Sequence, residues 1–186
     1  MNRAGAGLLM PLAAALLFMI STPPIMVQAA PDPPMEIPNE AVLKAAFIYN
    51  FTKFTTWQPD SCNPEHLIIG VFSSDPVSAN LKMLEGRKSG SKIIKVVRIQ
   101  DGIKSACVDL IYLPTLENLT NEDLNFMKQR HILLISEGRN SVAKGAIIAI
   151  YRVNNKIRFD INLEAARDSG IDLSSRLLNL AGRVIR

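Results

Sequence analysis

The chain has few cysteines and histidines and lacks the sequence motifs that mark common enzyme sites. Two cysteines and two histidines occur in 186 residues. His66 and His131 each stand at the start of a predicted strand, with no aspartate or cysteine at metal-ligand spacing around them. The phosphate-binding motif G-x-G-x-x-G and the Walker motif are both missing. We therefore expect no catalytic residues, no metal and no cofactor.

A strong charge of either sign is also lacking. The chain carries 21 lysines and arginines against 17 aspartates and glutamates, which gives a net charge of +4. Its lysines are spread over predicted helices and turns, whereas a nucleic-acid-binding surface concentrates basic residues and interleaves them with aromatics. We expect a solvated surface and no nucleic-acid partner.

The one long apolar run lies at the N-terminus. Arg3 precedes an apolar run over residues 8–20, which is interrupted only by Pro11 and is followed by Val27-Gln28-Ala29. This layout predicts a secretory signal peptide over residues 1–29, cleaved near Ala29, because the run is too short to span a bilayer. The mature protein is then exported and not inserted in a membrane. The alternative is a membrane anchor that is retained at the N-terminus.

The folded domain is expected to begin after a short linker. Residues 30–38 contain four prolines and predict a linker, so the domain covers residues 39–186. Asn39 is the predicted N-cap of its first helix. That helix is predicted to carry one apolar stripe, formed by Leu43, Phe47, Phe51, Phe54 and Trp57. Other residues are expected elsewhere on the helix surface, namely Lys44, Tyr49, Thr52 and Thr56. The stripe either packs on a sheet or is exposed to a partner.

Four β-rich segments alternate with helical segments along the middle of the chain, at residues 67–72, 93–99, 108–113 and 131–136. This order predicts an α/β fold, a Rossmann-like three-layer sandwich with a mostly parallel sheet and helices on both faces. Residues 146–153 and 156–161, joined by Asn154 and Asn155, predict a C-terminal hairpin at one edge of that sheet. Ser73 and Ser74 precede a predicted helix and either bind an anion or, as we expect, belong to the helix cap.

The two cysteines are predicted to form a disulfide. Cys62 and Cys107 lie just before the first and the third predicted strand. In a sheet of order 2-1-3 these strands are parallel neighbours, so their N-terminal ends lie side by side. A bridge that closes a separation of this length is worth roughly 3–4 kcal/mol. The alternative is two free thiols.

The C-terminal part of the chain concentrates charges of both signs. Asn162 and Ser174 are predicted to cap two helices, over residues 163–169 and from residue 175 to about Ile185. Seven charged residues surround this segment: Arg158, Asp160, Glu164, Arg167, Asp168, Asp172 and Arg176. Asp160 and Glu164 form either an acid/base pair or, as we expect, part of an arginine–carboxylate network on the surface. Such a mixed patch suits a specific protein interface.

Two blocks of the sequence resemble the YfiR family of small exported proteins. The N-terminal block, AAFIYNFTKFTTW, supplies Ala45, Ala46, Phe47, Tyr49, Phe51, Phe54 and Trp57. The C-terminal block supplies Arg158, Phe159, Asp160, Ile161, Asn162, Leu163, Ala165 and Ala166, then Ser174, Ser175, Leu177, Leu178, Leu180 and Ala181. The resemblance covers residues 41–184.

The resemblance implies a function without catalysis. A member of this family is expected to be a periplasmic repressor that binds the periplasmic sensor domain of an inner-membrane diguanylate cyclase. It would hold the cyclase inactive and so lower cyclic-di-GMP signalling and biofilm output. The family also suggests a disulfide that stabilises the fold and links repression to redox state, and a homodimer.

We expect the contact surface to include Glu164, Arg167 and Arg176, because they belong both to the charge cluster and to the C-terminal block. Two alternative functions stay open. One is a periplasmic small-ligand-binding protein that uses the carboxyl edge of the sheet near Ser73 to Pro76 and Pro114. The other is an accessory sensor for a histidine kinase.

Overall fold

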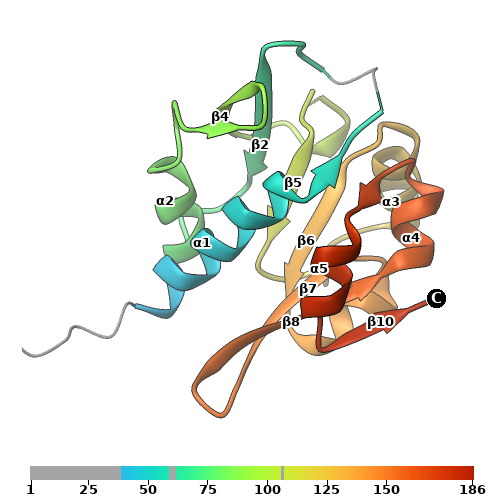
Figure 1. Ribbon diagram of the computed structural model, residues 1–186. Helices are drawn as coiled ribbons and strands as arrows, with labels where there is room; N and C mark the ends of the chain where they lie inside the picture. Colours follow the sequence, from blue (N-terminus) through green and yellow to red (C-terminus); the bar gives the residue numbers. More distant parts are fainter. Residues whose placement is uncertain (1–38, 59–61, 106) are drawn as a thin grey trace, which may run out of the picture. The chain divides into compact units, whose positions relative to one another are not determined.

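A mixed sheet forms the centre of the computed structural model, which describes residues 39–58, 62–105 and 107–186 (Figure 1). Among these residues the strand order is β10 (Arg183–Ile185), β8 (Lys156–Asn162), β7 (Ile148–Val153), β6 (Leu133–Glu137), β5 (Leu110–Leu113), β2 (His66–Val71), β4 (Lys92–Arg98) and β3 (Lys88–Ser89). The strands from β4 to β7 are parallel, whereas β8 runs antiparallel to β7 and β3 antiparallel to β4. The predicted signal peptide and linker lie outside the described residues.

Helices cover both faces of the sheet. On one face, α1 (Glu40–Lys53), α2 (Pro76–Lys82), α4 (Leu163–Asp168) and α5 (Ser175–Leu180) bury side chains in one apolar cluster. On the other face, α3 (Asn121–Gln129) and the short 3₁₀ helix η1 (Ile103–Ser105) bury theirs in a second cluster. The central strands are therefore apolar on both sides, as in Leu110 and Ile111 of β5, which are both completely buried. The predicted three-layer α/β fold is confirmed. No described helix has both the length and the apolar character needed to cross a bilayer.

The first helix is turned and shortened relative to the prediction. Asn39 caps it as expected, because its side chain accepts a hydrogen bond from the Ala41 amide. The helix ends at Lys53, however, so Phe54 and Trp57 lie beyond it. Its buried side is formed by Ala41, Lys44, Ala45, Ile48, Phe51 and Thr52. The predicted stripe was therefore wrong in phase for most of its members: Phe51 is buried as expected, but Leu43 and Phe47 are only half-buried, because the small residues Ala41 and Ala45 occupy the buried side.

The hairpin formed by β7 and β8 is confirmed, with Asn154 and Asn155 both at positive φ in its turn. It does not form the edge of the sheet, since β10 pairs with β8 in parallel. The prediction of a helix reaching Ile185 was wrong: α5 ends at Leu180, and the β-branched residues Val184 and Ile185 belong to β10.

The N-cap of α2 decides between the two interpretations of the segment around Ser73 and Ser74, anion binding and helix capping. The Asp75 carboxylate accepts hydrogen bonds from the amides of Val77 and Ser78 at 2.9 and 3.1 Å, and from the Ser73 hydroxyl at 2.6 Å. Desolvation opposes ionisation, but these hydrogen bonds outweigh it and lower the pKa of Asp75. The helix N-terminus therefore holds a carboxylate of the chain itself, as the capping interpretation predicted.

Candidate partner interface

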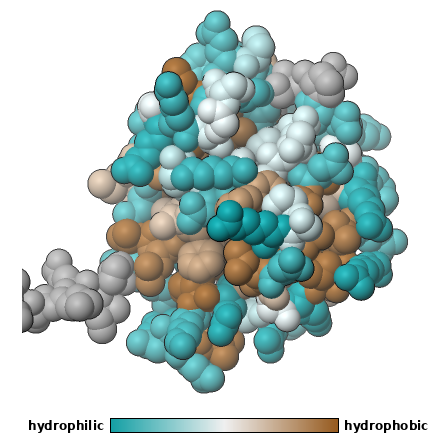
Figure 2. All heavy atoms as spheres, in the orientation of Figure 1, coloured by the Kyte–Doolittle hydropathy of each residue, from teal (hydrophilic) through white to brown (hydrophobic). Residues whose placement is uncertain are grey.

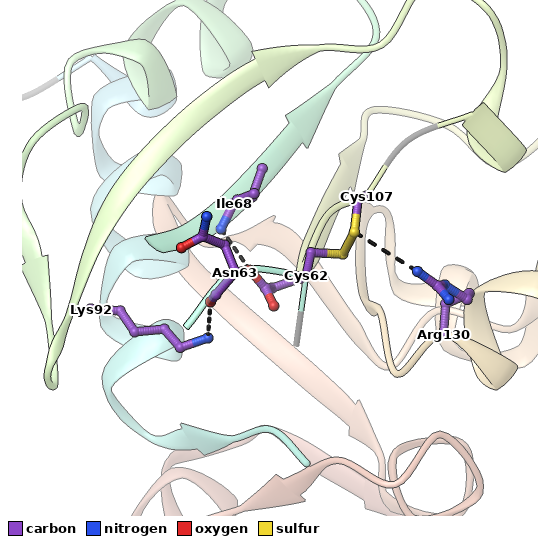
Figure 3. The surroundings of a disulfide bond; sticks show 7 residues. Cys62, Asn63, Ile68, Lys92, Cys107 and Arg130 are labelled. Atoms are coloured by element: carbon purple, nitrogen blue, oxygen red, sulfur yellow. Dashed lines mark hydrogen bonds between the residues drawn. A yellow bond between two sulfur atoms is a disulfide. The ribbon is translucent and has the colours of Figure 1, made fainter. Parts of the chain in front are cut away.

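A disulfide joins the N-terminal ends of two neighbouring strands. Cys62 precedes β2, Cys107 precedes β5, and their Cα atoms lie 5.4 Å apart in the bridge (Figure 3). The predicted pairing is confirmed, because β2 and β5 are parallel neighbours whose N-terminal ends meet at one edge. The Arg130 guanidinium, from the end of α3, approaches the Cys107 sulfur at 3.8 Å. Covalent closure of this edge fits an oxidising compartment.

A buried aspartate supports the same edge of the sheet. The Asp109 carboxylate accepts a hydrogen bond of 2.7 Å from the Ile68 amide, between β2 and β5. Burial raises the pKa of Asp109, against the opposing effect of its hydrogen bonds and of the Lys92 charge. The Trp57 indole donates to the carbonyl oxygen of Asp109 at 3.0 Å. The chain segment after α1 is therefore fastened next to the disulfide, a role that the apolar-stripe interpretation of Trp57 missed.

Hydrogen bonds also hold the C-terminal helices in position. The Asn162 side chain caps α4 by accepting from the Ala165 amide, and it donates to the carbonyl of Val142 in the 3₁₀ helix η2 (Arg139–Lys144). Between α4 and α5, β9 (Asp172–Leu173) pairs antiparallel with β1 (Thr55–Thr56). The Ser174 amide donates to the carbonyl of Phe54 at 2.9 Å. The end of α1 and the start of α5 are thus connected through backbone hydrogen bonds.

The three residues predicted to contact a partner are all exposed on these helices. Glu164 lies in the first turn of α4 and Arg167 in its last turn, three residues apart and so on one side of the helix. Arg176 lies in the first turn of α5, where its guanidinium stacks 5.6 Å from the centre of the Phe54 ring. Glu164, Arg167 and Arg176, together with Phe54 and Leu180, are called the C-terminal surface below.

Apolar side chains accompany these charges. Leu180, at the end of α5, keeps 60% of its surface exposed. Phe54 and Leu178 are half-buried and pack against the apolar core. Figure 2 shows hydrophobic residues at the surface over α1 and α5, interspersed with hydrophilic ones. A patch that mixes exposed apolar and charged side chains has the composition of a protein interface.

The predicted arginine–carboxylate network was wrong about Asp160. This residue is completely buried, and its carboxylate pairs with Arg183 at 3.3 Å and Arg139 at 3.8 Å, not with Arg158 or Arg167. Alternation along β8 explains the error, because Phe159 packs with the α1 cluster and its neighbour Asp160 points to the opposite face. Asp168 is likewise occupied, in an ion pair of 2.7 Å with Lys128 of α3.

An ion pair of a buried lysine at the carboxyl end of β6 was also missed by sequence reasoning. Lys44, expected on the helix surface, is buried, and its ammonium lies 2.6 Å from Glu137 and 2.8 Å from Glu40. Burial acts to lower the pKa of Lys44, but the hydrogen bonds to the two glutamates outweigh it and raise the pKa. Glu137 also accepts from the Tyr112 hydroxyl at 2.6 Å. The signal in the sequence was the spacing of Lys44 with Ala41 and Ile48 on one side of the helix.

The two histidines take part in structural contacts. His66 lies 3.1 Å from the Asn63 side chain, and the His131 ring lies 2.8 Å from the carbonyl of Ser169, to which its Nδ1–H donates. Across residues 39–58, 62–105 and 107–186, no group of three His, Cys, Asp or Glu side chains is arranged to hold a metal ion.

Similarity to solved structures is confined to the fold. The chain is similar to a Streptococcus pneumoniae ABC domain crystallised in complex with L-Trp, at 14% identity and a TM-score of 0.51. It is also similar to a conserved domain protein of Vibrio cholerae O1 biovar El Tor strain N16961, at 13% identity and a TM-score of 0.46. Each match covers 78% of this chain and 60% of the other, so the chain spans less than two thirds of either structure.

Sequence comparison defines the family more closely. No curated protein matches the chain. Residues 41–182, however, match the model of a family described as YfiR/HmsC-like, from the first turn of α1 to the residue before β10. Since this match includes both the α1 segment and the C-terminal surface, the chain belongs to the YfiR/HmsC-like family.

Proposed function

We propose that the protein is a periplasmic repressor that binds the periplasmic sensor domain of an inner-membrane diguanylate cyclase and holds the cyclase inactive. Membership of the YfiR/HmsC-like family supports a regulatory role. The observation that carries the proposal is the C-terminal surface, where Glu164, Arg167 and Arg176 are exposed, Arg176 stacks on the half-buried Phe54, and Leu180 is exposed at the end of the same helix as Arg176. These residues are free to meet a partner, whereas Asp160 and Asp168 are bound within the fold.

The mechanism is a shift between two states of the cyclase. A repressor that binds the sensor domain only in its inactive arrangement stabilises that arrangement by its binding free energy. Both signs of charge at the contact would orient the two proteins and exclude wrong partners. The repressor needs no catalytic group for this, and cyclic-di-GMP output falls because fewer cyclase molecules are active.

The disulfide supports the proposed location. Cys62 and Cys107 are joined at the N-terminal edge of the sheet, which fits an oxidising compartment such as the periplasm. The expected signal peptide over residues 1–29 would deliver the chain there. N-terminal sequencing of the protein recovered from the periplasm tests this step, and a mature chain beginning near Ala30 is the expected result.

The partner can be identified by capture on the oxidised mature protein. Membranes of the parent organism, solubilised in detergent, are passed over immobilised wild-type protein and over the Arg167→Glu variant, and bound proteins are identified by mass spectrometry. The proposal predicts a diguanylate cyclase on the wild-type protein and a much smaller amount on the variant. A histidine kinase in its place would keep the contact mechanism and reject the cyclic-di-GMP output.

A further inference from the structure

A cavity of about 400 Å³ lies at the carboxyl ends of β2 and β5, at the opposite end of these strands from the disulfide. Phe72 and Ser73 follow β2, and Pro114 and Thr115 follow β5, so both connections contribute to its walls. The chain leaves the two strands in opposite directions, since β2 continues through α2 to β4 and β5 continues through α3 to β6. In open α/β sheets, ligands bind at the crevice where the strand order reverses in this way.

The walls of the cavity suit the body of a small organic molecule. Five apolar side chains contribute to them: Phe72, Ile103, Leu113, Pro114 and Leu119. Polar groups come from Ser73, Thr115, Asn118 and Asp123. A mostly apolar lining with a few polar groups, at a volume within the usual range of roughly 300–1,000 Å³, is the composition of small-molecule sites.

Asp123 decides the charge that such a molecule carries, because it is the one ionisable residue among those that line the cavity. The Thr120 hydroxyl and amide donate to its Oδ2 at 2.6 and 3.1 Å, and these hydrogen bonds lower the pKa of Asp123. No residue in the described part of the chain donates a hydrogen bond to Oδ1. Nearby Lys104 is paired with Glu122 at 2.9 Å. The cavity thus offers an ionised carboxylate oxygen and no cationic lining residue.

We propose that this cavity is a binding site for a small organic cation, with an apolar body among Phe72, Ile103 and Leu119 and an ammonium group paired with Asp123. The site is separate from the C-terminal surface and does not depend on the proposed repressor function. Anions are disfavoured there, because each flanking helix already has an aspartate of the chain in place at its N-terminus: Asp75 is the N-cap of α2, and Asp123 accepts from the Thr120 amide in the capping box of α3.

The test uses three probes of the same shape and different charge: 2-phenylethylamine, 2-phenylethanol and phenylacetate. Each is titrated into the isotope-labelled oxidised protein at millimolar concentration and followed by two-dimensional amide NMR. The expected result is shift changes confined to residues 72–73, 102–103 and 113–123, with affinity falling in the order amine, alcohol, carboxylate. Absence of shift changes at these residues with the amine, or equal affinity for the carboxylate, would overturn the proposal.

Two substitutions locate the charge. Asp123→Asn keeps a side-chain oxygen that can accept from the Thr120 amide and is expected to weaken amine binding about threefold to fivefold, with alcohol binding unchanged. Asp101→Asn removes a charge from an exposed residue that does not line the cavity and is expected to change neither affinity. Equal losses in both variants, or none in Asp123→Asn, would contradict pairing with Asp123.

Asn118→Trp, which fills the cavity from its exposed rim, should abolish the shift changes for all three probes while the spectrum stays that of the folded protein.

Discussion

The Tyr151 hydroxyl donates a hydrogen bond of 2.6 Å to Oδ1 of Asp160, whose side chain is completely buried. Arg183 of β10 lies 3.3 Å from the other carboxylate oxygen, which has no hydrogen-bond partner among the described residues. A buried carboxylate is costly unless hydrogen bonds and opposite charges compensate it. Asp160 therefore connects the C-terminal strand to the sheet, and Tyr151 is part of that connection.

Tyr151→Phe is expected to lower the free energy of unfolding by about 1–3 kcal/mol, because it leaves the buried Asp160 carboxylate without its hydrogen bond. The matched control is Tyr49→Phe, which removes a hydroxyl that donates to the carbonyl of Lys88 at an exposed position. Its expected cost is below about 0.5 kcal/mol. Denaturant unfolding of both variants measures the difference, and equal losses would contradict the role given to Asp160.

Removing the disulfide is expected to destabilise the protein without changing its fold. The double substitution Cys62→Ser and Cys107→Ser should lower the free energy of unfolding by about 3–4 kcal/mol, because the unfolded chain loses a crosslink across a separation of 45 residues. A reducing agent should lower the stability of the wild-type protein by a similar amount and leave the variant unchanged. A wild-type protein whose free energy of unfolding does not change on reduction would show that the bridge contributes little to stability.

The stability contributed by Asp75 should depend on pH. Its folded pKa lies below the ordinary value of 3.8, so the stabilisation is present above that value and is lost as the pH falls through the folded pKa. Asparagine is also a good N-cap, so Asp75→Asn isolates the effect of the charge. We expect the variant to be less stable than the wild-type protein at pH 7 and equally stable near about pH 2. The same difference at both pH values would contradict this account.

Charge reversal on the C-terminal surface should act on binding and not on folding. Glu164→Arg and Arg167→Glu are each expected to weaken partner binding about tenfold, because a like charge then faces the partner. Both side chains are exposed, so the melting temperature should stay nearly constant. The matched control is Arg98→Glu, at an exposed residue of β4, which lies toward the opposite edge of the sheet from β8 and β10. Equal weakening by the control would indicate general electrostatics and not a defined interface.

The arrangement of the sheet could be predicted because it follows from the order of short apolar segments. Alternation of strands and helices led to parallel neighbours β2 and β5, and with them to the pairing of Cys62 with Cys107. The capping residues Asn39, Asn162 and Ser174 were also predictable, since their side chains satisfy amides only two or three residues away.

The errors arose where two patterns fitted the same residues. In α1, the aromatic residues suggested one buried side, whereas Ala41, Ala45 and Ile48 form the side that packs most closely on the sheet. Near the C-terminus, Val184 and Ile185 continued the apolar spacing of α5, but an open position beside β8 makes them a strand. Asp160 was assigned to the surface from its sequence neighbours, while its partner Arg183 comes from that unforeseen strand. These positions depend on contacts distant in sequence.

The central claim is tested most directly by the activity of the cyclase itself. Cyclic-di-GMP formation from GTP is measured with detergent-solubilised, full-length diguanylate cyclase of the parent organism and increasing amounts of the oxidised mature protein. The account predicts saturable inhibition by the wild-type protein and by Arg98→Glu, with Arg167→Glu requiring about tenfold more protein for the same effect. An unchanged rate of cyclic-di-GMP formation at the highest concentration of wild-type protein would contradict it.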